Sequence, residues 1–244
     1  MKIVMYILRL IQSFIRTLHI LMHTFGVSIK RVVLAGGLNF ILISLAGFPL
    51  SREPKEFPFR NMYMWIMIFT MMFSGGLIPL YLTVQKLRLM DTIWALVLPG
   101  AVSVFNLILV VNFFRNVPKE ILECASIDGA GPWTKLFKVM LPLSLPVMAT
   151  IMLYTIVGNW NASFDGLIFM NKTENYPLQT YIQQLVVTID PTKIRMDRLD
   201  ILQNISDRTL NAAKLVVTMV PIICIYPFLQ KYFITGITLG SVKE

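Results

Sequence analysis

The sequence predicts an all-α membrane protein that crosses the bilayer several times. Of its 244 residues, 56% are hydrophobic and only 14% are charged, and the mean hydropathy is +0.68. This composition is typical of a chain that lies mostly in lipid. Because one charge costs about 2.5 to 3.5 kcal/mol at the centre of a spanning helix, uncharged stretches of about twenty residues mark the predicted spans.

Five uncharged or nearly uncharged stretches meet this criterion. They are residues 32–50, 61–85, 92–114, 139–164 and 215–234, the last of which contains Lys231 near its end. The first thirty residues leave two alternatives open, because Arg9 and Arg16 interrupt their apolar run. They form either a sixth span or an amphipathic helix at the membrane surface, where arginines can snorkel. No small-residue cleavage site follows a compact apolar core, which argues against a signal peptide.

The net charge of +9 does not indicate a nucleic-acid-binding protein, because the basic residues lie beside the predicted spans and form no stripe. Anionic lipid and an orientation signal account for them better. Two loops carry most of this charge: Arg52, Lys55 and Arg60 in one, and Arg115, Lys119, Lys135 and Lys138 in the other. Both loops should be cytoplasmic, and alternation of spans then places the loop of residues 165–214 outside and the C-terminus inside.

The cysteines and histidines predict neither a disulfide nor a metal site. Cys124 falls in a predicted cytoplasmic loop and Cys224 in the last span. His19 and His23 are four residues apart, but no carboxylate or cysteine completes a ligand set. No boundary of a soluble domain is visible, so residues 1–244 are predicted to form one membrane domain.

The loop of residues 115–142 is polar, marked by glycines and more ordered in pattern than an ordinary connector. Pro118 suits the first turn of a short helix, and Gly129 suits its end, where the chain enters a left-handed turn. Pro132 opens a second helix whose apolar residues recur at helical spacing: Trp133, Leu136, Phe137, Met140 and Leu141. Pro142 and Pro146 then turn the chain into the next span. Periodicity alone also fits a simple amphipathic connector.

The spacing of residues 123–142 in this loop resembles a motif of a known protein family. Glu123, Cys124 and Ala125, then three residues, Gly129, nine residues and VMLP at 139–142 resemble the EAA loop, E-A-A-x3-G-x9-I-x-L-P, of binding-protein-dependent ABC importer permeases. The two departures, cysteine in the second position and valine for isoleucine, keep the acidic residue, the helix break and the elbow. GGLIPLYLTVQKLRLMDTIWALVLPG, NWNASFDGLIFMN and YPFLQKYFITGITLGSVKE resemble the carbohydrate-importer branch, the MalG-like and LplC-like permeases, whereas Met1 to Phe25 match it poorly.

This resemblance implies a type I ABC importer permease (MetI-like) fold in the bacterial inner (cytoplasmic) membrane. It also implies four kinds of partner: a homologous second permease, two cytoplasmic ATPase subunits, an external solute-binding protein and an oligosaccharide substrate. The chain has no G-x4-G-K-[ST] sequence, so ATP and Mg²⁺ are expected on the ATPases, with no cofactor and no catalysis in this chain.

The resemblance makes residues 115–142 the coupling loop, the name used below. Its segment from Glu120 to Gly131 is expected to move as a rigid lever, with Glu123 meeting a basic residue of the ATPase while Ile121, Leu122 and Ala125 fill its cleft. The predicted coupling residues are Glu120, Ile121, Leu122, Glu123, Cys124, Ala125, Asp128, Gly129, Ala130, Gly131, Leu141 and Pro142.

Polar residues within the spans predict a substrate path, since such residues usually face a bundle interior or a water-filled path. Amides bind sugar hydroxyls and aromatic rings stack on sugar C–H faces. The candidates are Ser103, Asn106, Thr155, Asn159, Trp160 and Asn161. The alternative is hydrogen bonding between helices together with an interfacial tryptophan.

An amphipathic segment at residues 176–189 is a candidate contact for the binding protein through Tyr176, Leu178, Ile182 and Leu185, or else a helix lying on the membrane surface. The sequence leaves two alternatives to an oligosaccharide importer permease. The first is a permease of the same class for an amino acid, peptide or anion. The second is a membrane-embedded enzyme, which the absence of a Ser/His or paired Asp constellation in the spans disfavours.

Overall fold

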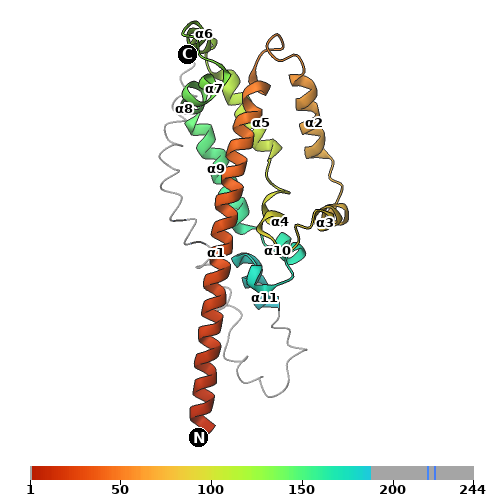
Figure 1. The fold of residues 1–244 in the computed structure, drawn as a ribbon, viewed down its shortest axis with the longest axis vertical. Coiled ribbons are helices and arrows are strands. Elements are labelled where there is room, and N and C mark those ends of the chain that lie inside the picture. The colour runs from red at the N-terminus through yellow and green to blue at the C-terminus, as the bar shows by residue number, and fades with distance from the viewer. Residues whose placement is uncertain (1, 188–218, 220–222, 224–244) are drawn as a thin grey trace. The chain divides into compact units, whose positions relative to one another are not determined.

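The computed structural model describes the backbone of residues 2–187, 219 and 223, and the side chains of residues 19–184, 219 and 223 (Figure 1). Within these residues there are helices and no strand, which confirms the predicted all-α class. The helices are α1 (Lys2–Ser51), α2 (Arg60–Met72), α3 (Leu77–Lys86), α4 (Ile93–Val97), α5 (Val104–Asn116), α6 (Lys119–Ile127), α7 (Pro132–Thr134), a π-helical segment (Lys135–Met140), α8 (Leu141–Leu143), α9 (Leu145–Asn161), α10 (Phe164–Phe169), a 3₁₀ turn (Thr173–Asn175) and α11 (Leu178–Val187).

The chain divides into two compact units, and each is described by itself. Unit 1 contains Met1–Val32, Tyr81–Leu96 and Gly158–Ile222. Unit 2 contains Val33–Leu80, Val97–Val157 and Ile223–Glu244.

Helix α1 runs without interruption through the first predicted span and the segment before it. The sequence left the first thirty residues as a separate span or a surface helix, but they continue directly into the next span. Its stretch His19–Ser51, 33 residues long, is apolar and long enough to cross a membrane. At 1.5 Å per residue this stretch measures about 50 Å, which exceeds the roughly 30 Å of a bilayer's hydrocarbon core.

The predicted span of residues 61–85 is not one straight helix. Helix α2 ends at Met72, and α3 starts at Leu77 after a bend of 111°. Gly76 has a φ of +85°, a backbone conformation that favours glycine. Apolar composition alone did not reveal this turn, because both glycines of the Gly75–Gly76 pair lie inside an uncharged stretch.

The predicted spans of residues 92–114 and 139–164 are also interrupted. Pro99 and Gly100 lie between α4 and α5, and Ser103 then caps α5 by accepting the backbone N–H of Asn106 at 3.4 Å. The segment Pro132–Leu143 meets α9 at 81°, with the break at Ser144. The described residues therefore contain one helix fit to cross a membrane, or three if each bent pair is one span. The predicted span of residues 215–234 lies almost wholly outside the described residues.

The core of unit 2 joins the end of α1 to α5, α9 and the coupling loop. Ile43 of α1, Leu107 and Val110 of α5 and Ile151 of α9 are fully buried in one cluster. Leu122 of α6 and Met140 of the π-helical segment belong to the same cluster. The coupling loop is therefore packed onto the ends of the helices by its own apolar residues.

In unit 1, α11 is packed among the unit's other elements. Leu178 and Ile182 form a cluster with Trp160 of α9, against which Leu21 and Phe25 of α1 pack. The Ser28 hydroxyl of α1 also accepts the backbone N–H of Leu178 at 2.8 Å. A helix is thus present within the predicted segment of residues 176–189, and its described apolar side chains Leu178 and Ile182 face the interior of unit 1.

Candidate functional site

The first half of the coupling loop follows the predicted geometry. Pro118 immediately precedes α6, and Gly129 has a φ of +77°. The backbone N–H groups of Gly129 and Ala130 return to the carbonyls of Ser126 at 3.0 Å and Ala125 at 2.8 Å. These bonds satisfy carbonyls at the end of the helix and fix the turn.

The second half departs from the predicted α-helix. Pro132 does occupy the first turn of α7, but residues 135–140 then form a π-helical segment. Leu136 and Met140 are buried, whereas Trp133 and Phe137 are exposed and stack on each other with ring centroids 6.1 Å apart. The single apolar face predicted for this helix is thus divided into a buried part and an exposed aromatic pair.

The coupling residues of α6 also divide by exposure. Leu122 is 8% exposed and packs in the core of unit 2, so it does not present its side chain to a partner as predicted. Ile121 is 38% exposed, and Ala125 is half-buried. The exposed members of the predicted set on α6 and its turn are Glu120, Ile121, Glu123, Cys124, Asp128, Gly129 and Gly131. Ile127, which is not among the predicted coupling residues, is 85% exposed and adds apolar area to this surface.

Two polar contacts brace the coupling loop. Lys119 forms an ion pair with Glu53, and Lys135 Nζ donates to Ser126 Oγ at 2.7 Å. The hydrogen bond and charge of Lys119 lower the pKa of the Glu53 carboxyl, and those of Glu53 raise the pKa of Lys119. The pair therefore weakens only when pH falls through the lowered pKa of Glu53 or rises through the raised pKa of Lys119.

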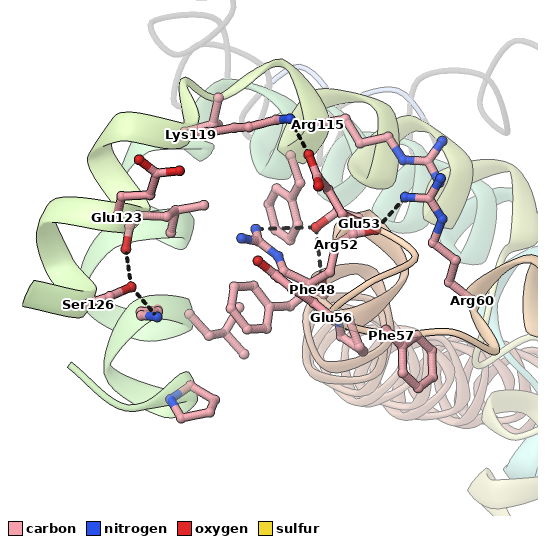
Figure 2. A pocket seen from close by; sticks show the side chains of 18 of the residues that line it. Phe48, Arg52, Glu53, Glu56, Phe57, Arg60, Arg115, Lys119, Glu123 and Ser126 are labelled. Carbon is pink, nitrogen blue, oxygen red and sulfur yellow. Dashed lines mark hydrogen bonds and ion pairs between the residues drawn. The ribbon is translucent and has the colours of Figure 1, made fainter. Parts of the chain in front are cut away.

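A cavity of about 820 Å³ lies beside the coupling loop, between its helices and the end of α1 (Figure 2). Arg52 and Glu53 line it from the chain that follows α1, and Glu123, Ser126 and Trp133 line it from the coupling loop. Every residue that lines it belongs to unit 2. In the sequence, Arg52, Arg60 and Arg115 serve only as orientation signals, and nothing there predicts that they line one cavity.

The first three substrate-path candidates take part in contacts within unit 2. Asn106 Nδ2 donates to Thr155 Oγ1 at 3.3 Å, and Thr155 Oγ1 donates to Asn39 Oδ1 at 3.1 Å. Asn39 Nδ2 in turn donates to the carbonyl of Ala101 at 3.0 Å. Ser103 caps α5. In this structure these side chains connect α1, α5 and α9, as the alternative of interhelical hydrogen bonding describes.

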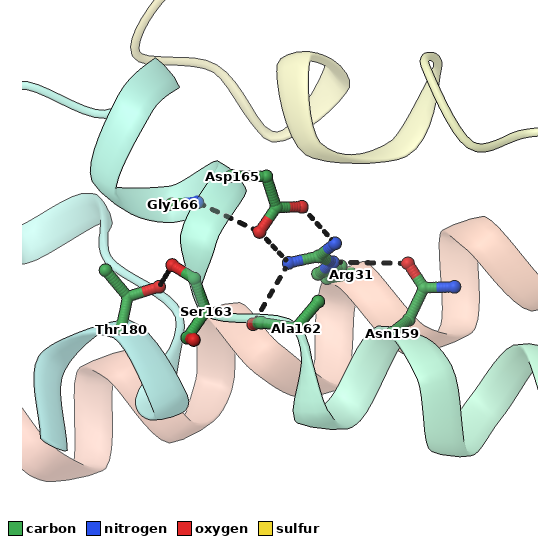
Figure 3. A network of polar contacts seen from close by, with 7 residues as sticks. All are labelled: Arg31, Asn159, Ala162, Ser163, Asp165, Gly166 and Thr180. Atoms are coloured by element: carbon green, nitrogen blue, oxygen red, sulfur yellow. Dashed lines mark hydrogen bonds and ion pairs between the residues drawn. The ribbon is translucent and has the colours of Figure 1, made fainter. Parts of the chain in front are cut away.

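Asn159 is the first residue of the Asn159–Trp160–Asn161 segment, here called the NWN cluster, and it lies beside Arg31 in unit 1 (Figure 3). Arg31 is 4% exposed, forms an ion pair with Asp165, and donates from Nε to Asn159 Oδ1 at 3.2 Å. Trp160 is also 4% exposed and meets Phe25 edge to face, with centroids 5.7 Å apart. Trp160 thus has little ring surface for a sugar here, whereas Asn161 is exposed.

The predicted contacts with a binding protein are mostly buried. Tyr176 is 8%, Leu178 0% and Ile182 7% exposed, because they pack within unit 1. In the described residues these three side chains therefore offer little surface to a partner, and the contact with a binding protein stays a prediction. The side chain of Leu185 lies outside the described residues.

Arg31, Asp165 and Asn39 were not predicted from the sequence as site residues. Arg31 and Asp165 are charges of opposite sign at the ends of two predicted spans, which was the available signal for a pair. Their separation of 134 residues gave no way to match them. Among the described residues no group of three or more His, Cys, Asp or Glu side chains is placed to hold a metal ion.

Comparisons with known proteins define the class. The model of the family described as "Binding-protein-dependent transport system inner membrane component" matches residues 40–239. The chain belongs to this family: it is a membrane-embedded permease subunit of the ABC transporter class, with the type I (MetI-like) fold and no catalytic role of its own. The class predicted from the EAA loop, a permease of a binding-protein-dependent ABC importer, is confirmed.

The names of individual relatives indicate the kind of solute that those proteins transport. The chain is 38% identical over 217 residues to the polygalacturonan/rhamnogalacturonan transport system permease protein YtcP of Bacillus subtilis (strain 168), covering 89% of this chain and 75% of the relative. It is also 38% identical over 224 residues to Protein LplC of the same organism, covering 91% and 74%. The crystal structure of a bacterial ABC transporter involved in the import of the acidic polysaccharide alginate matches with a TM-score of 0.78 at 30% identity, covering 89% of this chain and 78% of that one.

Proposed function

We propose that this chain is the transmembrane subunit of an ATP-driven importer of oligosaccharides. It pairs with a homologous second permease to form the translocation path, and a solute-binding protein delivers the sugar from outside. The observation that carries the proposal is the similarity to permeases named for polygalacturonan/rhamnogalacturonan transport and to a structure involved in alginate import. These similarities span about nine tenths of the chain, so they include the spans as well as the coupling loop.

The coupling loop transmits the work of ATP hydrolysis. ATP and Mg²⁺ are held by two cytoplasmic ATPase subunits, and this chain supplies the surface that they push. The tight turn at Gly129, the Lys119–Glu53 ion pair and the packing of Leu122 support a lever that moves as one body. Closure of the ATPase dimer switches the spans only if the ATPase binds the two states of the permease with different free energies.

Glu123 is the residue to test first, because it is exposed on α6 and acidic where a basic ATPase residue is expected. In the reconstituted complex, Glu123→Lys should abolish the stimulation of ATP hydrolysis by the binding protein. The matched control is Lys138→Glu, a charge reversal of equal size at an exposed position of the same loop. Unchanged stimulation in Glu123→Lys, or an equal loss in the control, would contradict the lever assignment.

The substrate contact is best placed on the exposed member of the NWN cluster. Asn161→Ala should weaken transport severalfold and leave basal ATP hydrolysis intact, because Asn161 is exposed. Asn159→Ala should lower both, since Asn159 holds the buried Arg31 guanidinium. If Asn161→Ala transports as well as the unmodified protein, the sugar contacts lie elsewhere, for example on the second permease.

The nature of the solute needs a separate experiment. A cognate binding protein should bind oligosaccharides in a screen that also contains amino acids, peptides and inorganic anions. Acidic oligosaccharides belong in this screen, because the similar crystal structure is that of a transporter involved in the import of alginate, an acidic polysaccharide. Binding of a peptide, amino acid or anion alone would support the alternative of a permease for a non-sugar solute while leaving the importer class unchanged.

A further inference from the structure

The cavity beside the coupling loop combines an apolar wall with an excess of basic groups. Five basic and three acidic side chains line it: Arg52, Arg60, Arg115, Lys119 and Lys135, with Glu53, Glu56 and Glu123. Leu45, Phe48, Phe114 and Leu122 contribute apolar surface. Its volume of about 820 Å³ is within the range of about 300 to 1,000 Å³ that is usual for small-ligand sites.

Arg52 has unused capacity to bind an anion. Its guanidinium lies over the Phe48 ring, 4.5 Å from the centroid, on the side of the cavity that faces Glu123 and Ser126 (Figure 2). Its Nε is buried and has no hydrogen-bond partner among the residues that the structure describes, while Nη2 makes one long bond of 3.4 Å to Ser51 Oγ. Burial lowers the pKa of Arg52, and the charge of Glu56 opposes this only in part. A buried donor without a partner is costly, so an acceptor in the cavity would stabilise it.

The other two arginines also lack carboxylate partners. Arg60 donates to the carbonyl of Arg52 and to Asn61, and Arg115 Nη2 donates to the carbonyl of Leu50 at 3.1 Å. Neither forms an ion pair within the described part of the chain. Burial, and then repulsion from Arg60, lower the pKa of Arg115. Arg60 and Arg115 therefore repel each other, while Glu56 attracts Arg52 and Glu53, which is paired with Lys119, attracts Arg60.

The position of the cavity indicates the source of the missing anion. Arg52 directly follows Ser51, where the apolar stretch His19–Ser51 ends. The end of a span lies at the level of the lipid headgroups, and basic pockets between spans are suited to anionic headgroups. The apolar wall suits an acyl chain, which inorganic phosphate lacks.

We propose that this cavity binds the phosphate of an anionic phospholipid, with Arg52, Arg60 and Arg115 around the phosphate and an acyl chain along Phe48 and Phe114. A phospholipid and inorganic phosphate both offer a phosphate group to the arginines. The apolar wall of the cavity and its position at the end of a span favour the phospholipid. The proposal is independent of the transported solute, so it stands or falls separately from the importer function.

The test is lipid binding to the purified full-length protein in detergent, measured by native mass spectrometry. Phosphatidylglycerol should bind at least tenfold more tightly than phosphatidylcholine. Arg52→Gln should weaken phosphatidylglycerol binding about fivefold, which corresponds to about 1 kcal/mol for one basic residue near a headgroup. Arg52→Lys keeps the charge and should retain most of the affinity. Arg115→Gln should give a similar loss and replaces Arg52→Gln if that variant does not fold.

Lys138→Gln is the matched control, because Lys138 is an exposed basic residue of the same loop that does not line the cavity. It should leave the affinity nearly unchanged. Equal binding of the two lipids, or an equal loss in Lys138→Gln, would overturn the proposal, since binding would then be unspecific. Displacement of phosphatidylglycerol by millimolar inorganic phosphate would also overturn it, since the site would then accept the free anion.

Discussion

Arg31, which is buried, forms an ion pair with the largely buried Asp165 in unit 1, and Asn159 and the carbonyl of Ala162 complete the set of groups around the guanidinium (Figure 3). A second donor of the guanidinium, Nη1, reaches Asp165 Oδ1 at 3.1 Å. Moving two charges out of water is costly, and the pair offsets that cost only while both partners are present. The contact therefore fixes how α1, α9 and α10 meet within the unit, more than it adds net stability.

Removal of one partner should expose this cost. Asp165→Asn should destabilise the protein by about 3 kcal/mol, the lower end for a broken buried pair, because Asp165 is about one quarter exposed. The double variant Arg31→Met with Asp165→Leu should recover most of the loss. Thermal unfolding of the purified protein in detergent measures both. A single variant as stable as the unmodified protein, or a double variant less stable than the single one, would contradict this account.

At the scale of elements, the coupling loop shows what local sequence can and cannot predict. Pro118, Gly129 and Pro132 act through their own backbone preferences, so both helix starts and the turn between them were predictable. The π-helical segment and the burial of Leu122 depend on packing against α1, α5 and α9, which lie far away in sequence.

Two other elements differ from the expectation based on sequence, each for its own reason. Hydropathy identified the apolar stretches of unit 2 but not the bend at Gly76, because a turn inside such a stretch changes no charge. Helical periodicity predicted α11 but left open whether its apolar side contacts a partner or the membrane surface, whereas in the structure Trp160 and Phe25 cover it. The packing of α11 is thus a contact between distant segments, whereas the bend at Gly76 is a local turn.

The turn of the coupling loop can be tested with two glycines of different conformation. Gly129→Ala should favour opening of residues 119–131 about five- to thirtyfold, because a side chain at φ +77° costs about 1 to 2 kcal/mol. Gly131→Ala should change it much less, since Gly131 has a φ of −70° and open space around it. Amide hydrogen exchange measures this opening. Equal exchange in the two variants would mean that the turn does not depend on glycine.

At the scale of the whole molecule, the distribution of charge predicts which loops face the cytoplasm. The coupling loop must lie on the ATPase side for the proposed mechanism, and the positive residues of both basic loops give the same orientation. Alternation of the spans then places the segment around Lys172 on the opposite side, a consequence that membership in the family alone does not fix.

Cysteine labelling decides this orientation, because the chain has only two cysteines and Cys124 is exposed. In a Cys224→Ser background, a membrane-impermeant maleimide should label Cys124 only after the cells are permeabilised. In a cysteine-free background, Lys172→Cys should be labelled in intact cells, since Lys172 is exposed and lies in the predicted external loop. Labelling of both positions in detergent provides the control for reactivity. Labelling of Cys124 in intact cells would reverse the topology and remove the coupling loop from the ATPase side of the membrane.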